Sequence, residues 1–102
     1  MIERRRTPRY SVVAIAEVLD AESGVRLDAR TANLNLTGCY VATTNPLLAG
    51  RRVKLQLTHG DISIEMHGTV IHSEMNAGMG ISFTELEASH LATLEKWFAE
   101  LG

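Results

Sequence analysis

Two clusters of polar residues in this 102-residue chain have types and spacings suited to binding a ligand. In the basic segment 3–9, ERRRTPR, Arg5 and Arg9 lie four positions apart, and a planar guanidinium can bind phosphate through two hydrogen bonds or stack on an aromatic base. In the segment 33–38, NLNLTG, Asn33 and Asn35 share a strand parity, so we expect their amides on the same side. An amide both donates and accepts hydrogen bonds, which suits the edge of a purine base.

The charge of the chain is unevenly distributed. Residues 1–10 carry a formal charge of +3, which leaves −5 for the remaining 92 residues, given the total of −2. A general nucleic-acid binder spreads positive charge over a face, so no nucleic-acid polymer is expected as a partner. A short basic arm on a weakly acidic body suits a small, compact anion or an acidic patch on a partner protein. A solvated terminal tail is the alternative interpretation of this segment.

Catalytic and metal-binding patterns are not found in the sequence. The four histidines are spaced by 8, 5 and 18 residues, which matches no common metal-ligand motif. They are His59, His67, His72 and His90. The single cysteine, Cys39, has no neighbouring base and is expected to be a small buried hydrophobic residue. We therefore expect no catalytic residue, no metal and no cofactor.

Hydrophobic periodicity predicts six strands followed by one helix. The expected strands occupy residues 11–20, 25–34, 38–44, 53–58, 62–71 and 79–83. The segment 11–20 is apolar on both parities, which favours a closed barrel with another element packed outside it. The composition, 45% hydrophobic and 22% charged, is typical of a globular protein.

The end of the chain changes to a helical period. Apolar residues recur there at three- and four-residue spacing: Leu91, Leu94, Phe98 and Leu101. Thr84 and Glu87 have the spacing of a capping box, and the helix is expected over about 86–101. The sequence thus predicts a flexible basic arm at residues 1–9 and one domain at 10–102. No apolar run approaches the roughly 20 residues that span a bilayer, so we expect no membrane insertion and a cytoplasmic location.

Taken together, these motifs resemble those of the PilZ domain, a bacterial receptor for the second messenger cyclic di-GMP (c-di-GMP). That family is marked by Arg-x-x-x-Arg near its start and by Asp/Asn-x-Ser-x-x-Gly some twenty to thirty residues later. Arg5 and Arg9 match the first motif, and Asn33 and Gly38 match the ends of the second. The segment 78–83, GMGISF, is similar to the family's Gly-x-Gly-Ile-x-Phe strand.

The resemblance implies a six-stranded antiparallel β-barrel with a C-terminal helix, and a function without catalysis. By this resemblance, Arg5 and Arg9 would bind phosphate and the Hoogsteen edge of guanine, and Asn33 would hydrogen-bond a guanine. Gly38 would leave room for the ligand at the barrel surface. Arg4 could stack on a second guanine and favour an intercalated ligand dimer. Ligand binding would order the arm and so signal to a downstream protein effector.

Asn35 departs from the family pattern, which usually has serine at this position. Its amide could replace the hydroxyl contact, or it could crowd the guanine. Some members of the family have lost the nucleotide motifs and act only as protein adaptors. A PilZ-like adaptor that binds no nucleotide is therefore the alternative function.

Overall fold

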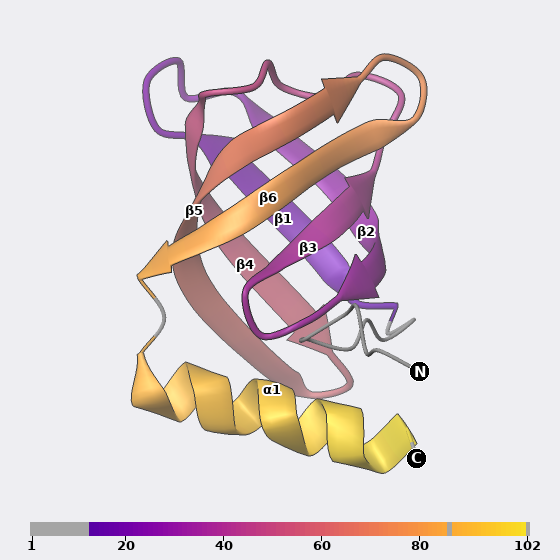
Figure 1. Ribbon diagram of the computed structural model, residues 1–102, viewed down its shortest axis with the longest axis vertical. Helices are drawn as coiled ribbons and strands as arrows, with labels where there is room; N and C mark the ends of the chain where they lie inside the picture. Colours follow the sequence, from indigo (N-terminus) through magenta and orange to yellow (C-terminus); the bar gives the residue numbers. More distant parts are fainter. Residues whose placement is uncertain (1–12, 86, 102) are drawn as a thin grey trace, which may run out of the picture.

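The computed structural model describes residues 13–85 and 87–101, which form a closed barrel of six antiparallel strands and one helix (Figure 1). The strands lie in the order β1-β2-β3-β6-β5-β4 around the barrel. Their bounds are Ile15–Asp20 for β1, Arg26–Leu34 for β2, Gly38–Ala42 for β3, Arg52–His59 for β4, Ile62–Glu74 for β5 and Gly78–Glu85 for β6; helix α1 is Ala88–Leu101. The expected fold class is confirmed, while the expected arm at residues 1–9 lies outside the described residues.

Alternate residues of the strands fill the interior, because successive side chains of a strand point to opposite faces. In β4, Val53, Leu55 and Leu57 are buried, whereas the side chain of Lys54 between them is exposed. The same alternation in the other strands gives one continuous core. Its largest fully buried barrel side chains are Leu34, Leu55, Leu57, Met79 and Ile81.

The outer side of β1 differs from the sequence-based expectation. Ala16 and Val18 point inward and are buried, as its period predicts. Val13 and Ile15, on the other parity, are 59% and 54% exposed. The prediction that another element covers this outer face was wrong for the described residues, because α1 packs across one end of the barrel instead (Figure 1).

Strand β5 turns the corner that closes the barrel, pairing with β4 along its first part and with β6 along its second. Its register with β6 shifts between His67 and Gly68. A Cβ atom at Gly68 would lie 2.6 Å from Cγ2 of Ile81 and 2.9 Å from the carbonyl oxygen of Ser82. Glycine therefore lets β5 cross β6 closely at this bulge.

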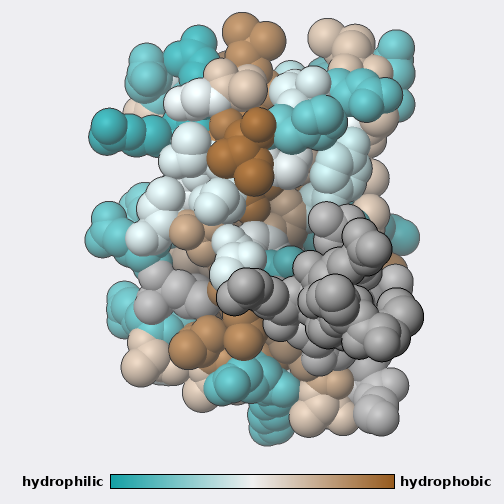
Figure 2. Space-filling view, viewed as in Figure 1, coloured by the Kyte–Doolittle hydropathy of each residue, from teal (hydrophilic) through white to brown (hydrophobic). Residues whose placement is uncertain are grey.

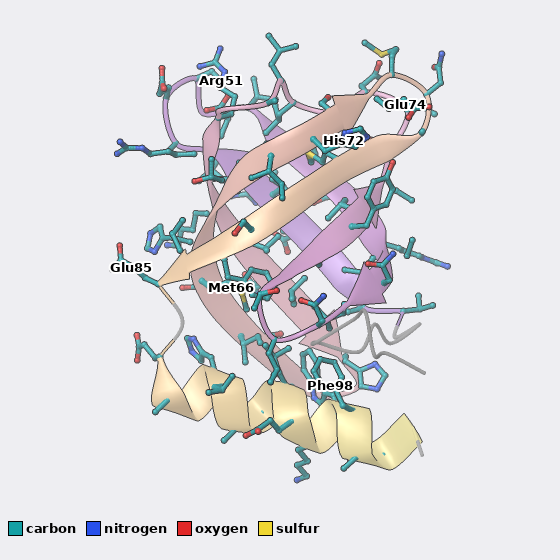
Figure 3. All side chains as sticks on the ribbon, in the orientation of Figure 1. Arg51, Met66, His72, Glu74, Glu85 and Phe98 are labelled. Carbon is teal, nitrogen blue, oxygen red and sulfur yellow. The ribbon has the colours of Figure 1, made fainter. Side chains whose placement is uncertain are left out.

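Helix α1 is held to the barrel end by its apolar face. Leu94, Trp97 and Phe98 are buried, and Phe98 points from the helix toward the barrel (Figure 3). The ring of His59, at the end of β4, lies 5.3 Å from that of Trp97 between centroids. The helix begins at 88, close to the expected 86, but the capping-box interpretation was wrong because Thr84 belongs to β6.

Candidate functional site

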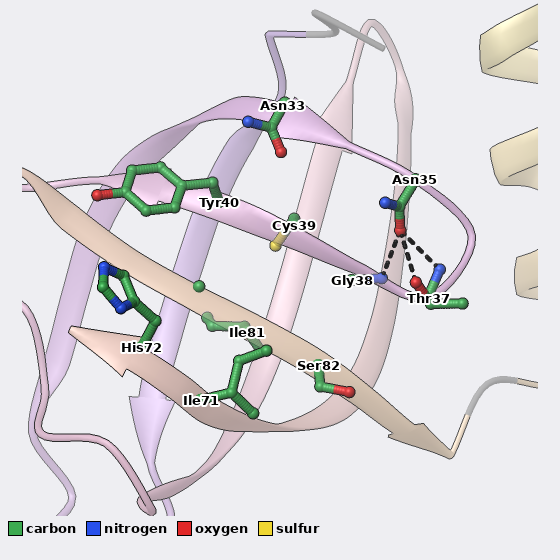
Figure 4. A pocket seen from close by; sticks show the side chains of 11 residues that line it. Asn33, Asn35, Thr37, Gly38, Cys39, Tyr40, Ile71, His72, Ile81 and Ser82 are labelled. Carbon is green, nitrogen blue, oxygen red and sulfur yellow. Dashed lines mark hydrogen bonds between the residues drawn. The ribbon is translucent and has the colours of Figure 1, made fainter. Parts of the chain in front are cut away.

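A hollow of about 330 Å³ opens on the barrel wall where β2, β3, β6 and part of β5 meet (Figure 4). Asn33, Asn35 and Gly38, the three residues singled out in the segment 33–38, all line it. They come from the end of β2, the following turn and the start of β3. The fold thus brings these predicted site residues together.

Asn33 faces the hollow because β2 contains a bulge. Thr31 is buried and pairs with Val41, but the next paired residue of β2 is Asn33, opposite Tyr40. The extra residue on β2 reverses the side-chain parity. As a result Leu34 enters the core, and Asn33 lies half-buried on the outer wall.

Asn35 closes the turn between β2 and β3 with its side-chain oxygen. Its Oδ1 accepts hydrogen bonds from the backbone N–H groups of Thr37 and Gly38 and from the Thr37 hydroxyl, each at 2.9 Å (Figure 4). Its own backbone N–H donates to the carbonyl oxygen of Gly38, also at 2.9 Å. The amide nitrogen of Asn35 makes no hydrogen bond within the described part of the chain. Asn35 therefore has a structural role through its oxygen and keeps two N–H donors available at the hollow.

A glycine is required at residue 38 because strands β3 and β6 approach each other closely there. It lies opposite Ser82 in the β3–β6 register. A Cβ atom at Gly38 would overlap the carbonyl oxygen of Ile81. The glycine thus permits close backbone approach between β3 and β6.

A row of directly paired residues crosses the floor of the hollow. Asn33 pairs with Tyr40, Tyr40 with Gly80, and Gly80 with His72, across the four strands β2, β3, β6 and β5. Tyr40 and His72 line the hollow but were not predicted as site residues. The signal available in the sequence was Gly80 of the 78–83 segment, although only the strand register shows that Tyr40 and His72 lie on either side of it.

The described residues that line the hollow carry no fixed charge. Burial raises the pKa of the Cys39 thiol to about 12, so this side chain stays protonated and inert, as expected of a buried cysteine. His72 is exposed, with its Nε2 3.9 Å from Oε1 of Glu74, an ion pair only when the imidazole is protonated. The described lining therefore offers neutral hydrogen-bonding groups and two aromatic rings.

Three predicted site residues lie outside the described residues: Arg4, Arg5 and Arg9. The first described part of the chain nevertheless joins the barrel beside the hollow. The backbone N–H of Ala14 donates to Oγ1 of Thr31 at 3.0 Å, and its carbonyl oxygen accepts from the Thr31 N–H at 2.9 Å. Asn33 follows Thr31 by two residues on the same strand. The described chain therefore begins next to the strand that carries Asn33.

A second hollow, of about 550 Å³, lies near the start of β4. Its lining includes both Arg52 and Glu85, together with His67. It contains no residue of the segments 33–38 and 78–83. Within residues 13–85 and 87–101, no group of three or more His, Cys, Asp or Glu side chains could hold a metal ion.

The sequence matches the PilZ domain family over residues 3–100, a range that includes Arg5, Arg9 and the 33–38 segment. The chain therefore belongs to the PilZ family. No curated protein matches it significantly in sequence.

Solved structures of PilZ proteins share the fold at low sequence identity. The PilZ domain of YcgR from Escherichia coli, solved with c-di-GMP, has a TM-score of 0.78 and 19% identity, covering 97% of this chain and 92% of that one. The PilZ domain of CeSA from a cellulose-synthesizing bacterium has a TM-score of 0.70 and 16% identity, covering 92% and 97%. MotI/DgrA, an inhibitor of motility from Bacillus subtilis, has a TM-score of 0.73 and 17% identity, covering 94% and 50%.

The chain corresponds to one part of the longer proteins in this group. It spans half the length of the MotI chain and 46% of the YcgR chain solved with c-di-GMP. The described residues contain no helix that is both long and apolar enough to cross a bilayer.

Proposed function

We propose that this PilZ domain is a non-catalytic receptor for cyclic di-GMP. The observation that carries the proposal is the convergence of Asn33, Asn35 and Gly38 on one hollow. Membership of the PilZ family supports it, as does the fold shared with a YcgR domain solved with c-di-GMP. The ligand is a compact dianion with two guanine bases, so it needs both cations and neutral hydrogen-bonding groups.

The arginines supply the cations in this proposal. Arg9 lies four positions before Val13, and such a segment spans at most about 14 Å when extended. Because Ala14 is paired with Thr31, two residues before Asn33, we expect Arg9 to reach the hollow without any change in the barrel. The guanidinium groups of Arg5 and Arg9 then bind phosphate and the O6 and N7 acceptors of guanine. Arg4 stacks on a second guanine if a ligand dimer binds.

The barrel wall supplies the neutral contacts. Asn33 offers its amide to the edge of a guanine. Asn35 donates through its amide nitrogen, because its oxygen is already engaged by Thr37 and Gly38. In this arrangement Asn35 replaces the usual serine without giving up the turn.

Signalling follows from the charge of the arm. A bound dianion nearly neutralises the +3 of residues 1–10 and fixes the arm on the barrel wall. A cytoplasmic effector protein that contacts this wall then encounters a different charge and shape. Binding thereby shifts the population of the arm toward one conformation that the effector recognises.

The alternative function is an adaptor that binds a protein and no nucleotide. The observation that favours it is the exposure of Val13 and Ile15, two apolar side chains on the outer side of β1. An adaptor of this kind does not need Arg5 or Arg9. The two functions are therefore separated by ligand titration.

Calorimetric titration of the purified chain with cyclic di-GMP tests the proposal, with GTP and the linear dinucleotide as controls. We expect saturable binding that is selective for the cyclic dinucleotide and that weakens as salt increases, because phosphate contacts are screened. The absence of binding heat at high ligand concentration would leave the adaptor as the function. The stoichiometry distinguishes a ligand monomer from an intercalated dimer.

Replacing both Arg5 and Arg9 with alanine is the matching variant. The loss of two charge-assisted contacts is expected to weaken affinity about 100-fold or more, with no change in thermal stability. Arg26→Ala is the control, because Arg26 pairs with Glu17 on another wall of the barrel. If both variants bind like the unaltered chain, the arm is not part of the site.

A further inference from the structure

The second hollow, near the start of β4, is lined by five polar side chains that make no ion pair and no hydrogen bond with any described residue. These side chains belong to Arg52, His67, Thr69, Thr84 and Glu85. The cations beside the hollow are paired instead: Arg51 Nη1 lies 3.2 Å from Oε2 of Glu22, and Lys54 Nζ lies 3.8 Å from Oε1 of Glu65. The unpaired polar groups therefore gather at the hollow itself.

The strand register holds two opposite charges apart on either side of this hollow. Arg52 lies opposite Thr69 in the β4–β5 pair, and Glu85 lies opposite His67 in the β5–β6 pair. Because Thr69 and His67 are two residues apart on β5, the two charges lie on a diagonal across three strands. With strands about 4.8 Å apart and a rise of about 3.4 Å per residue, the Cα atoms of Arg52 and Glu85 are about 12 Å apart. The backbone thus leaves space between a guanidinium and a carboxylate.

A bulge in β6 brings a hydroxyl group to the same hollow. His67 pairs with Glu85, whereas the next residue of β5, Gly68, pairs with Phe83. Thr84 is therefore the extra residue of β6, and a bulge changes the direction of the side chains around it. Thr84 lines the hollow, and Glu85 extends outward at the end of the strand (Figure 3). A bulge thus places polar groups at this hollow, as the bulge of β2 does at the first one.

The charges of the lining select the class of ligand. Among the described lining residues, Arg52 is the fixed cation and Glu85 is the fixed anion. Glu85 would repel a simple anion, and Arg52 would repel a simple cation. A molecule that carries one charge of each sign satisfies both groups. The volume of about 550 Å³ lies within the range of small-molecule sites, about 300–1,000 Å³.

We propose that the second hollow binds a small zwitterion of the α-amino acid class. The carboxylate of the ligand binds the guanidinium of Arg52 through two hydrogen bonds, and its ammonium group donates to the carboxylate of Glu85. The hydroxyls of Thr69 and Thr84 and the imidazole of His67 contact the remainder of the ligand. This site is separate from the first hollow and does not rest on the function proposed above.

Amino-acid binding is tested by nuclear magnetic resonance on the isotope-labelled full chain without cyclic di-GMP. Each standard amino acid is added separately at increasing millimolar concentration. We expect at least one of them to shift the backbone amide resonances of residues 52, 67, 69, 84 and 85 in a saturable way. The resonances of Asn33, Asn35 and Gly38, at the first hollow, should not move. If no amino acid produces these shifts, the proposed site is wrong.

Two substitutions test the charged contacts. Arg52→Gln and Glu85→Gln should each weaken binding of the amino acid about tenfold, because each removes a charge-assisted hydrogen bond. Both side chains are exposed and unpaired in the described fold, so both variants should unfold at the same temperature as the unaltered chain. Arg26→Gln is the matched control and should bind normally, because Arg26 pairs with Glu17 away from this hollow. Equal binding by all three variants would overturn the site.

Ligand analogues assign each charge of the ligand to its partner. The amide of the amino acid lacks the carboxylate, and the N-acetyl derivative lacks the ammonium group. Arg52→Gln should bind the amide as well as the unaltered chain does, because the contact that this variant removes is already missing. Glu85→Gln should treat the N-acetyl derivative in the same way. A variant that weakens its matched analogue about tenfold as well would contradict the assigned contacts.

The two hollows are tested by different ligands, so their failures are distinguishable. If the chain binds cyclic di-GMP but no amino acid, the second site alone is wrong. If it binds an amino acid at the second hollow but no cyclic di-GMP, the proposed function is wrong and the second site stands. Arg52→Gln and Glu85→Gln should bind cyclic di-GMP within about twofold of the unaltered chain, since distant sites act independently.

Discussion

Two walls of the same barrel have outer surfaces of contrasting chemistry. On the wall formed by β1, β4, the start of β2 and the first part of β5, which we call the ion-pair wall, two pairs of outward charges lie close to each other. Arg26 Nη1 lies 3.5 Å from Oε1 of Glu17, and Lys54 Nζ lies 3.8 Å from Oε1 of Glu65. The wall around the hollow, which we call the hollow wall, carries amides, two rings and a glycine, with no fixed charge among its described lining residues.

The comparison shows that one sheet can have a wall with charged side chains paired to each other and a wall that keeps unused hydrogen-bond donors and open space. Two ion pairs on the ion-pair wall join four of its charged side chains to each other. The hollow wall has unused hydrogen-bond donors and open space. Apolar side chains also form a band down the face that β5 and β6 present, where Ile71 is 65% exposed (Figure 2).

The largest effect on stability is expected at Gly38, and Gly80 on the same wall provides the contrast. Gly38→Ala forces a Cβ atom against the Ile81 carbonyl oxygen and should destabilise the fold by about 3 kcal/mol, the range of an overpacked site. Gly80→Ala, on the same wall, should change the free energy of unfolding by less than about 0.5 kcal/mol. Urea denaturation measures both, and equal losses would show that the two glycines serve the same purpose.

Two substitutions of Asn35 sharpen the comparison, because they test the roles of its side-chain oxygen and its side-chain nitrogen separately. Asn35→Ala removes the acceptor of three hydrogen bonds in the turn and should cost about 1–2 kcal/mol of stability. Asn35→Asp keeps the acceptor and loses only the N–H donors, so it should unfold near the unaltered chain yet bind ligand more weakly.

Asn35→Asp also introduces a negative charge, which weakens the binding of an anion by repulsion. Titration at increasing salt separates this repulsion from the loss of a hydrogen bond. Repulsion is screened as salt increases, whereas a lost hydrogen bond is not. Recovery of the Asp variant's affinity relative to the unaltered chain at high salt would therefore argue against donation by the Asn35 amide.

A smaller effect is expected at Asp20, at the end of β1. The backbone N–H of Glu22, 2.9 Å from Oδ1, together with weaker contacts from Ser23 and Arg51, lowers the pKa of this carboxyl group, although burial opposes the shift. A lowered pKa means that the carboxylate stabilises the fold above its ordinary pKa and that this stability is lost as pH falls through the lowered value. Asp20→Asn should therefore reduce the melting temperature at neutral pH, and the gap in melting temperature between the variant and the unaltered chain should narrow in acid. A gap that widens on acidification would contradict this.

The smallest effect is expected on the ion-pair wall. Glu17→Gln removes one partner of an exposed pair, and such pairs contribute little in water. The free energy of unfolding should change by less than about 0.5 kcal/mol, and cyclic di-GMP affinity should not change. A clear loss of affinity in calorimetry would show that the two walls are not independent.

Much of the fold was predictable because it depends on local patterns. The alternation of Val53, Leu55 and Leu57 marks a strand, and the spacing of Leu94 and Phe98 marks a helix. What period alone does not reveal is where the helix lies. The two-sided apolar pattern of β1 suggested a covered wall, but Ile15 is exposed and α1 lies across the barrel end.

The candidate site was predictable only in part, for a physical reason. Asn33 and Asn35 are close in sequence, so their shared placement could be anticipated, although a bulge and a turn produce it rather than parity alone. Tyr40 and His72 are brought together through Gly80 by the pairing of three strands. Such register depends on contacts distant in sequence, and no local pattern shows it.

The pairing of Ala14 with Thr31 has a further consequence for the strength of binding. In the proposed receptor, this anchor would limit the distance between the arginines and the hollow and give them an effective concentration in the millimolar range that is typical of short tethers. Their encounter with a ligand already seated on the wall is then an intramolecular event. The affinity of the whole site depends on the length of that tether as well as on the contacts that the side chains make.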